Sequence, residues 1–380
     1  MDLDLTKGHR TFRDKVRHFS EEEVLPVARE IDEKDLFPDD VITKAGKMGL
    51  LGIITPKEYG GMGKDLISYV LAIEEISKAS PSVALTISVN NSLICSPLVH
   101  FGSEEQKTEY LPKLASGEWL GSFALTEPGA GTDAGSLSTT ANRENDSYII
   151  NGSKMFITNM GKSSMILVFA KTSPEKGTRG ISAFLVRAPD NALVTEAVLE
   201  GMGMRGSQQM SFQMKNLRVP IQNMLGKEGE GFKIGLWSLN MGRLGIAAQA
   251  LGIAQAALED ALEYASKREQ FGRPLSDFQA IQFRLADMAI EIEAAKSMII
   301  RAAWRMEKGS ASPSDPAMAK LLASHVAIKV SGDALTILGG RGYLKGSRVE
   351  KLYRDAKITE IYEGTSDVQR MIIARQLLSR

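Results

Sequence analysis

The sequence has little cysteine and no surplus of charge of either sign. Its 380 residues include one cysteine, and 46 lysine and arginine residues stand against 46 aspartate and glutamate residues. A single cysteine excludes an intramolecular disulfide and any multi-cysteine zinc or iron–sulfur site. Cys95 follows Leu93 and Ile94, and we interpret it as a small buried side chain. The four histidines are scattered along the chain, so we expect no metal site.

The balanced charge argues against two classes of partner. A nucleic-acid or membrane-surface protein needs a field of one sign, and the net formal charge is zero. The chain begins Met1-Asp2-Leu3-Asp4, which is acidic where a targeting peptide is basic. The apolar helical stretch Leu244–Leu258 is too short to cross a bilayer. We expect a soluble, cytoplasmic protein with no nucleic-acid partner, no membrane insertion, and a buried substrate or an apolar self-interface.

Residues 1–120 read as a helical domain. Apolar residues recur at intervals of three and four, as in Leu66–Ile76. The segments Ser20–Glu23 and Ser103–Gln106 have the pattern of capping boxes, in which a hydroxyl and a later polar side chain satisfy the free donors of a first turn.

Residues 121–230 change to short β-branched or alternating runs separated by turn formers, among them Asn151-Gly152 and Lys176-Gly177. The predicted strands are Tyr148–Ile150, Met155–Thr158, Met165–Phe169, Ile181–Val186 and Met210–Met214. Strands at this spacing, without long helices between them, predict an antiparallel barrel or sandwich.

Residues 231–380 return to the helical period at greater length. The predicted helices are Phe232–Lys267, Asp277–Lys308, Ala317–Leu338 and Ser366–Leu378. Long apolar helices joined by short loops predict an antiparallel bundle. The fold class is therefore multi-domain α+β, with an N-terminal helical domain, a central antiparallel β-domain and a C-terminal four-helix bundle.

Two glycine-rich stretches are candidates for ligand sites, and only the second keeps that interpretation. Gly201–Gly206 matches the dinucleotide fingerprint GxGxxG, but the strand-like segment Ser207–Met214 follows where a helix is required, so we interpret it as a tight turn. Phe123–Gly135 combines a Pro-Gly turn, two threonine hydroxyls and several open N–H groups. Such a loop can line a planar polar ligand and its phosphates, although an ordinary glycine-rich connection has the same composition.

At this second stretch the chain resembles the acyl-CoA dehydrogenase family of flavoenzymes over essentially its whole length. The motifs that carry the resemblance are Phe123–Asp133, Phe156–Thr158, Met204–Ser207, Arg268–Gly272, Ile337–Gly340 and Arg354–Ser366. Ser88–Leu93 and Met241–Arg243 resemble the short-chain, butyryl-CoA branch. The resemblance implies the same three domains and a role in fatty-acid β-oxidation.

The resemblance implies α,β-dehydrogenation of an acyl-CoA, with FAD accepting the β-hydride at flavin N5. A weakly acidic α-proton needs a carboxylate base on one side of the Cα–Cβ bond and the flavin on the other. Glu363 matches that base, and its N–H together with a ribityl hydroxyl would hold the thioester oxygen. Some relatives place the base at the position of Gly242, which glycine cannot serve. Without the resemblance, Glu363 reads as a solvated surface acid.

The resemblance also implies the cofactor contacts. The flavin and pyrophosphate loop and the strip against the isoalloxazine comprise Phe123, Leu125, Thr126, Gly131, Thr132, Phe156, Ile157 and Thr158. The residues matching contacts to the FAD of a neighbouring subunit are Arg268, Phe271 and Gln279. The remaining contacts match Leu338, Gly339, Gly340, Thr365, Ser366 and Asp367. A helix C-terminal cation is the alternative interpretation of Arg268.

Substrate contacts follow from the same comparison. The matching positions are Val89, Thr132, Asn240, Arg243, Ile246, Tyr362 and Gly364. Asn240 stands where the short-chain pattern has aspartate, and Ala84 stands where glutaryl-CoA enzymes have an arginine. Aliphatic bulk at Ile246 and Val89 predicts a short acyl chain of about four carbons by close packing. Branched or alicyclic acyl groups stay open as alternatives.

The leading interpretation is a homotetramer, a dimer of dimers, that passes electrons to an electron-transfer flavoprotein. One alternative is an acyl-CoA oxidase, in which oxygen reoxidises the flavin. Another is a non-catalytic flavin-binding relative, which would carry a basic extra segment and an altered base position. Neutral charge and Glu363 favour the enzyme.

Overall fold

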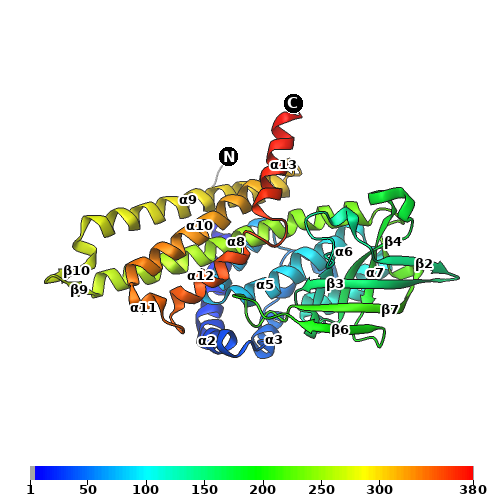
Figure 1. The fold of residues 1–380 in the computed structure, drawn as a ribbon, viewed down its shortest axis with the longest axis horizontal. Coiled ribbons are helices and arrows are strands. Elements are labelled where there is room, and N and C mark those ends of the chain that lie inside the picture. The colour runs from blue at the N-terminus through cyan, green and yellow to red at the C-terminus, as the bar shows by residue number, and fades with distance from the viewer. Residues whose placement is uncertain (1–4, 380) are drawn as a thin grey trace.

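The computed structural model describes residues 5–379, so the acidic start that entered the targeting argument lies outside the described residues. Figure 1 shows the N-terminal helices in blue and cyan, the sheet in green at one end, and the long C-terminal helices in yellow and orange. The predicted fold class is confirmed, and helix α8 runs from the sheet toward the opposite end of the molecule.

The N-terminal block is helical. Its helices are α1 (Lys7–Phe19), α2 (Leu25–Lys34), α3 (Asp39–Lys47), α4 (Leu66–Ala79), α5 (Pro81–Val89), α6 (Ser96–Phe101) and α7 (Glu104–Ser116). Ser103 forms the predicted capping box with Gln106. The capping box predicted at Ser20–Glu23 is wrong, because α1 continues through a π-helical segment at Ser20–Val24. The Ser20 hydroxyl instead donates to the Val16 carbonyl at 2.9 Å.

Among residues 5–379, two helical stretches other than Leu244–Leu258 are long and apolar enough to cross a membrane by length and composition. The stretch Pro81–Phe101 has a mean hydropathy of 1.4 and is 94% buried inside the protein. Ser314–Leu338 has the same mean hydropathy but is 44% buried. Burial of the first stretch is typical of a core helix, and the second packs on α8.

The middle block forms a sheet. Its strands are β1 (Gly121–Ala124), β2 (Thr140–Glu144), β3 (Ser147–Ile157), β4 (Met165–Lys171), β5 (Ile181–Arg187), β6 (Leu193–Val198), β7 (Met210–Pro220) and β8 (Met224–Leu225). The order is β6-β7-β3-β2-β4-β5-β8, and β1 pairs with β4. Most pairs are antiparallel, whereas β4 pairs in parallel with β1 and β2.

Two predicted turns have different outcomes. Lys176-Gly177 lies in the 3₁₀ connection Pro174–Gly180 between β4 and β5, as expected. Asn151-Gly152 is not a turn, because the two strands predicted around it form the single strand β3 with a register shift against β7. A side chain at Gly152 would overlap Thr139, which explains glycine at that bulge.

The fingerprint-like segment Gly201–Gly206 is an irregular loop that leads to strand β7. The tight-turn interpretation is confirmed. A Cβ at Gly203 would lie 2.7 Å from the carbonyl oxygen of Arg354, and Gly206 has a φ of +86°. These glycines allow close backbone approach to α12 and a left-handed turn.

The C-terminal block is a helical bundle. Its elements are α8 (Gly231–Lys267), the hairpin strands β9 (Glu269–Gln270) and β10 (Arg273–Pro274), α9 (Gln279–Glu307), α10 (Ser314–Leu338), α11 (Gly340–Tyr343), α12 (Arg348–Ile358) and α13 (Ser366–Leu378). The four predicted helices are present with ends shifted by up to three residues. Two helices, α11 and α12, were not predicted.

Helix α8 joins the blocks. Every residue from Met241 to Ala254 is buried, and α8 packs against α4, α5, α9, α10, α12 and β5. A Cβ at Gly252 would overlap the Glu74 carbonyl of α4, so a glycine is required at this helix crossing. The main hydrophobic cluster therefore contains residues of the N-terminal and C-terminal helices together.

The β-domain buries an ion pair behind its first loop. Lys154 Nζ lies 2.8 Å from Glu127 Oε1 and donates to the Leu125 carbonyl at 3.2 Å. Glu127 also accepts from Ser138 and Thr139. Burial lowers the pKa of Lys154 to about 8, against the opposing effect of Glu127. Burial alone would raise the pKa of Glu127, but Lys154 and the donors lower it to about 2.

We predict that Lys154→Met destabilises the protein by about 3 kcal/mol, because it leaves the Glu127 carboxylate buried without its cation. The matched control is Arg218→Met, whose partner Glu144 lies 3.2 Å away with both side chains more than half exposed. The control should cost less than about 1 kcal/mol. Thermal melting of both variants checks this, and equal melting temperatures would contradict it.

Candidate active site at the turn before the last helix

Glu363 lies in the turn between α12 and α13. Its backbone is left-handed, with φ of +52°, and Gly364 follows with φ of +95°. Thr365 caps α13 by accepting a hydrogen bond from the Val368 N–H at 3.3 Å. Two consecutive positive φ values reverse the chain sharply, and a non-glycine residue at such a position is a strained feature typical of functional sites.

The Glu363 carboxyl group lies against α8 at Gly242. A Cβ at Gly242 would overlap Oε2 of Glu363, so only glycine leaves room for the carboxyl group. Oε2 is buried and has no hydrogen-bond partner among residues 5–379. Burial raises the pKa of Glu363 to about 8, while Lys320 and Arg243 oppose this rise. A carboxyl group with this pKa can gain or lose a proton near neutral pH.

Three polar side chains surround the backbone of this turn. Arg243, 4% exposed, directs Nε to the Glu363 carbonyl at 3.4 Å. Gln369 Nε2 donates to the Gly364 carbonyl at 2.8 Å, and Lys320 Nζ donates to the same oxygen at 2.9 Å. The donors therefore satisfy backbone carbonyls and leave the carboxylate unpaired.

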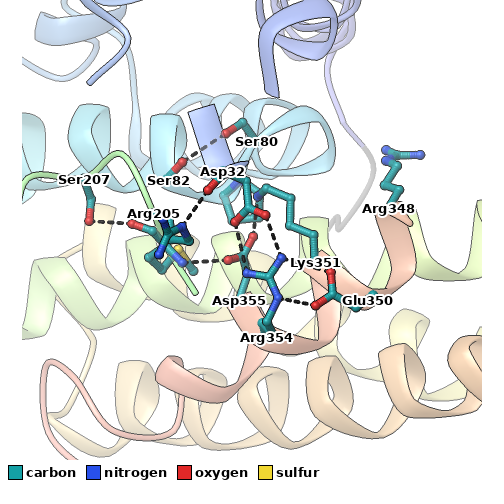
Figure 2. Close-up of polar contacts among 12 residues, drawn as sticks. Asp32, Ser80, Ser82, Arg205, Ser207, Arg348, Glu350, Lys351, Arg354 and Asp355 are labelled. Carbon is teal, nitrogen blue, oxygen red and sulfur yellow. Dashed lines mark hydrogen bonds and ion pairs between the residues drawn. The ribbon is translucent and has the colours of Figure 1, made fainter. Parts of the chain in front are cut away.

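Ion pairs fix α12, which leads into the turn (Figure 2). Arg354 binds Asp32 of α2 at 2.6 Å and Glu350 at 2.5 Å. Asp355 accepts from Lys351 at 2.5 Å and from the Met204 N–H at 2.6 Å. The network joins α12 to the N-terminal helices and to the loop before β7, and so limits movement of Glu363.

Among the expected substrate-binding residues, some are buried in the main hydrophobic cluster and others form side-chain hydrogen bonds. Val89 and Ile246 are buried in one apolar cluster, and Tyr362 packs against it. The Tyr362 hydroxyl donates to Gln249, which is fully buried. Asn240 accepts from Arg243 Nη1 at 2.6 Å. These positions are consistent with an apolar wall, and their contacts with substrate stay a prediction.

The expected flavin residues of the β-domain form two adjacent segments. The Met155 N–H donates to the Thr126 carbonyl at 3.0 Å, and the Ser122 hydroxyl donates to the Thr158 carbonyl at 2.7 Å. These bonds place the strand that carries Phe123 beside the end of β3. The residues brought together are Phe123, Leu125, Thr126, Phe156, Ile157 and Thr158.

Helix α8 connects this strip to the base. If Gly235 carried a Cβ, that atom would lie 3.4 Å from the Phe169 ring and 3.9 Å from the Leu125 side chain. Gly242, seven residues after Gly235 on the same helix, faces Glu363. Seven residues advance a helix by about 10 Å and turn it to within about 20° of the same face. The strip and the carboxyl group therefore lie along one side of α8.

A second group of predicted cofactor residues lies at the opposite end of α8. The hairpin β9–β10 lies at the end of the molecule away from the sheet (Figure 1). Arg268 follows the last residue of α8, and Phe271 in the hairpin is 94% exposed. Arg268 and Leu338 line a cavity of about 600 Å³. Gln279, Gly339 and Gly340 are exposed at the same end. The structure does not bring this group to Glu363 of the same chain.

Several residues of the site were missed by sequence reasoning, chiefly Lys320, Gln369 and Gln249. A signal was present for the lysine, because Lys320 continues the helical spacing of Ala323 and Ala327 on the apolar face of α10. A charge at such a position is rarely buried without a partner. The partner, a carbonyl forty-four positions later, is not visible in local sequence.

Comparison with protein families covers nearly the whole chain. Models of the acyl-CoA dehydrogenase N-terminal, middle and C-terminal domains match residues 6–118, 122–217 and 229–378. The chain belongs to the acyl-CoA dehydrogenase family. It is an oxidoreductase that acts on acyl-CoA, and FAD is its cofactor. The predicted family, enzyme class and cofactor are confirmed.

Curated relatives and solved structures agree. An acyl-CoA dehydrogenase of Bacillus subtilis is 48% identical over 99% of both chains. The short-chain specific acyl-CoA dehydrogenase of Clostridium acetobutylicum is 45% identical over 99% of this chain and all of that protein. The butyryl-CoA dehydrogenase structure from Megasphaera elsdenii superposes with a TM-score of 0.98 at 43% identity, covering both chains fully.

A further solved chain is described with the electron transferring flavoprotein of Acidaminococcus fermentans and flavin-based electron bifurcation. It covers both chains fully, with a TM-score of 0.98 and 45% identity. The chain is thus similar to short-chain acyl-CoA dehydrogenases over its full described length.

The residues present fit FAD. Ser366 Oγ is buried and finds no hydrogen-bond partner within residues 5–379, which leaves it available to a ligand. A register shift between β3 and β7 spans Phe156, a residue that is 57% exposed and has a backbone φ of +60°. A bulge of this kind redirects a side chain, here an aromatic ring suited to a planar partner. Asp367 is exposed and pairs with Arg370 at 2.7 Å, so its predicted cofactor contact stays a prediction.

We predict that Gly242→Ala lowers the rate of flavin reduction by acyl-CoA about 100-fold. The new methyl group would displace the Glu363 carboxyl group, and misplacing a reacting group by about 1 Å can lower a rate by about 100-fold. The melting temperature should change little, since the clash involves the end of a flexible side chain. Gly332→Ala, in α10 with its nearest neighbour at 3.5 Å, is the control. A wild-type rate in Gly242→Ala would contradict the assignment.

Proposed function

We propose that this chain oxidises a short-chain acyl-CoA to the trans-2-enoyl-CoA, with Glu363 removing the α-proton. The observation that carries the proposal is the Glu363 carboxyl group, whose Oε2 is buried, unpaired within residues 5–379 and fitted against Gly242. A base must be close to its substrate proton and have a pKa near the working pH. Burial gives Glu363 such a pKa, because it disfavours the charged form.

The backbone of the same turn supports carbonyl binding. Among residues 5–379, the Glu363 N–H donates no hydrogen bond to the protein. A free N–H beside the base can stabilise the charge that develops on a thioester oxygen as the α-proton leaves. Glu363 would then hold the carbonyl with its backbone and accept the proton with its side chain.

FAD, when bound, supplies the acceptor for the hydride that leaves the β-carbon. The strip containing Phe156–Thr158 would hold the flavin ring, and Thr126, Thr132 and Ser366 would hold its polar parts. Glu127 and Lys154 position this strip through the Leu125 carbonyl. Val89 and Ile246, both buried in the main hydrophobic cluster, would supply apolar surface that excludes water from the acyl group.

The substrate class rests on the buried side chains and on similarity. Aliphatic residues Val89 and Ile246 limit the space for an acyl chain, and the relatives include short-chain specific enzymes and a butyryl-CoA dehydrogenase. We therefore propose an acyl group of about four carbons. Branched and alicyclic groups of similar volume are compatible with the same wall.

The electron acceptor, the location and the domain limits are part of the same proposal. The similar chain described with an electron transferring flavoprotein supports an electron-transfer flavoprotein as acceptor. The bacterial relatives support a cytoplasmic enzyme. Domains of 1–120, 121–230 and 231–380 follow the change from helix to sheet and back.

A homotetramer explains the distant group of cofactor residues. Arg268 is 26 residues after Gly242, which corresponds to about 39 Å along α8. One chain therefore cannot place Arg268 and Glu363 on the same flavin ring. Exposed apolar residues at this end and along α9, namely Phe271, Phe283 and Ile290, favour coverage by another copy.

The function is tested by anaerobic titration of the FAD-loaded protein with acyl-CoAs of increasing length while the flavin spectrum is recorded. We expect bleaching to be fastest near four carbons. Glu363→Gln should keep FAD and acyl-CoA binding but bleach at least about 1,000-fold more slowly, since general-base catalysis is worth about 10²–10⁴. Glu259→Gln, an exposed α8 variant, is the control. Rapid bleaching by Glu363→Gln would place the base elsewhere.

We predict that Arg268→Ala loses FAD and dissociates the tetramer together, because the guanidinium of one copy would bind the cofactor of another. Flavin content from absorbance and mass from light scattering measure both effects. Lys233→Ala, exposed near the start of α8, should change neither. A variant with full flavin content and intact assembly would refute the role in a neighbouring subunit.

A further inference from the structure

Lys320 is a fully buried cation without a carboxylate at hydrogen-bond distance in the described structure. It lies on α10, with no exposed surface, and its Nζ donates to the Gly364 carbonyl at 2.9 Å. A buried ammonium group loses its hydration and is retained only where compensation or function requires it. The ion pairs found among residues 5–379 do not include Lys320.

The position of this ammonium group is tied to the turn that presents the base. Glu363 and Gly364 both have positive φ, so their carbonyls point in directions that a helix would not allow. Gln369 and Lys320 donate to the Gly364 carbonyl from α13 and α10. One turn along α10, Ser324 donates to the Thr359 carbonyl at 2.8 Å. Helix α10 thus holds both ends of the segment.

The charged and titratable groups near the base come from four directions. They are Arg243 on α8, Lys320 on α10, Tyr69 on α4, and Tyr362 and Glu360 in the turn itself. Burial raises the pKa of Glu363 to about 8, and Lys320 is the larger of the two cationic effects that lower it. Burial lowers the pKa of Lys320 to about 8, while Glu363 raises it. The two groups therefore favour each other's charged forms.

We propose that Lys320 is a positioning residue for Glu363, which fixes the turn through the Gly364 carbonyl and favours the carboxylate form without a hydrogen bond to it. The proposal rests on the proposed role of Glu363 as the base. A direct ion pair would occupy the oxygen that must accept the substrate proton. A cation bound to the adjacent carbonyl supplies charge and leaves that oxygen open.

Two substitutions separate the charge from the hydrogen bond. Lys320→Gln keeps a donor and loses the charge, whereas Lys320→Met loses both. Lys329→Met, on the same helix but half exposed, is the matched control. The measurement is the pH dependence of kcat/KM and of the anaerobic bleaching rate, made on FAD-loaded protein together with flavin content and melting temperature.

We expect Lys320→Gln to move the acidic limb of kcat/KM upward by about one pH unit and to lower the rate below pH 7 about tenfold, with unchanged flavin content. Lys320→Met should show the same shift and a lower rate at every pH, because the turn also loses a donor. Lys329→Met should keep the wild-type profile. If Lys320→Met fails to fold, the pH profile of Lys320→Gln decides.

An unshifted pH profile in Lys320→Gln would overturn the proposal, as would a loss of rate that is identical at all pH values. These outcomes are distinct from failure of the proposed function. If Glu363→Gln still bleaches rapidly, the base itself is wrong. If Glu363→Gln is inactive and the lysine variants keep the wild-type profile, the base stands and the role of Lys320 falls.

Discussion

The structure depends on keeping one carboxyl oxygen buried and unpaired. Glu363 is held against α8 where Gly242 has no side chain, and its Oε2 has no partner within residues 5–379. Burial of such a group costs free energy, because the ionised form loses hydration. The surrounding structure compensates by fixing the turn from three sides, through α8, α10 and α12. The strain of a left-handed Glu363 is maintained by those contacts, as is usual at functional sites.

Helix α8 is the element through which the domains meet. Its glycines mark close approaches: Gly231 to Ser182 of β5, Gly242 to the base and Gly252 to α4. Each would be more favourable as alanine in an isolated helix, so their presence reflects close packing. A helix with no polar face over its central turns must be surrounded, and here elements of all three blocks pack against it. Helix α8 thus fixes the distance and the orientation between the flavin-binding strip and the Glu363 carboxyl group.

The sequence was informative where the pattern is local and long. The four long C-terminal segments show a sustained helical period, and their ends agree with the structure to within three residues. Helix α12 was missed because its eleven residues are mostly charged and are held by distant partners such as Asp32. Ser20 looked like a cap, but burial of Phe19 and Val24 keeps the helix going. Glu363 was identified only through family resemblance, since nothing near it in sequence shows its burial.

The arrangement of cations explains how a buried carboxyl group can serve as a base. If Arg243 or Lys320 bound the Glu363 carboxylate directly, the pKa would fall and the oxygen would be occupied. Instead their hydrogen bonds go to the carbonyls of Glu363 and Gly364. Electrostatic attraction acts at longer range than a hydrogen bond, so the carboxylate is stabilised in part and stays free to accept a proton. The opposing effects of burial and nearby charge then set the pKa between those of a solvated acid and an isolated buried one.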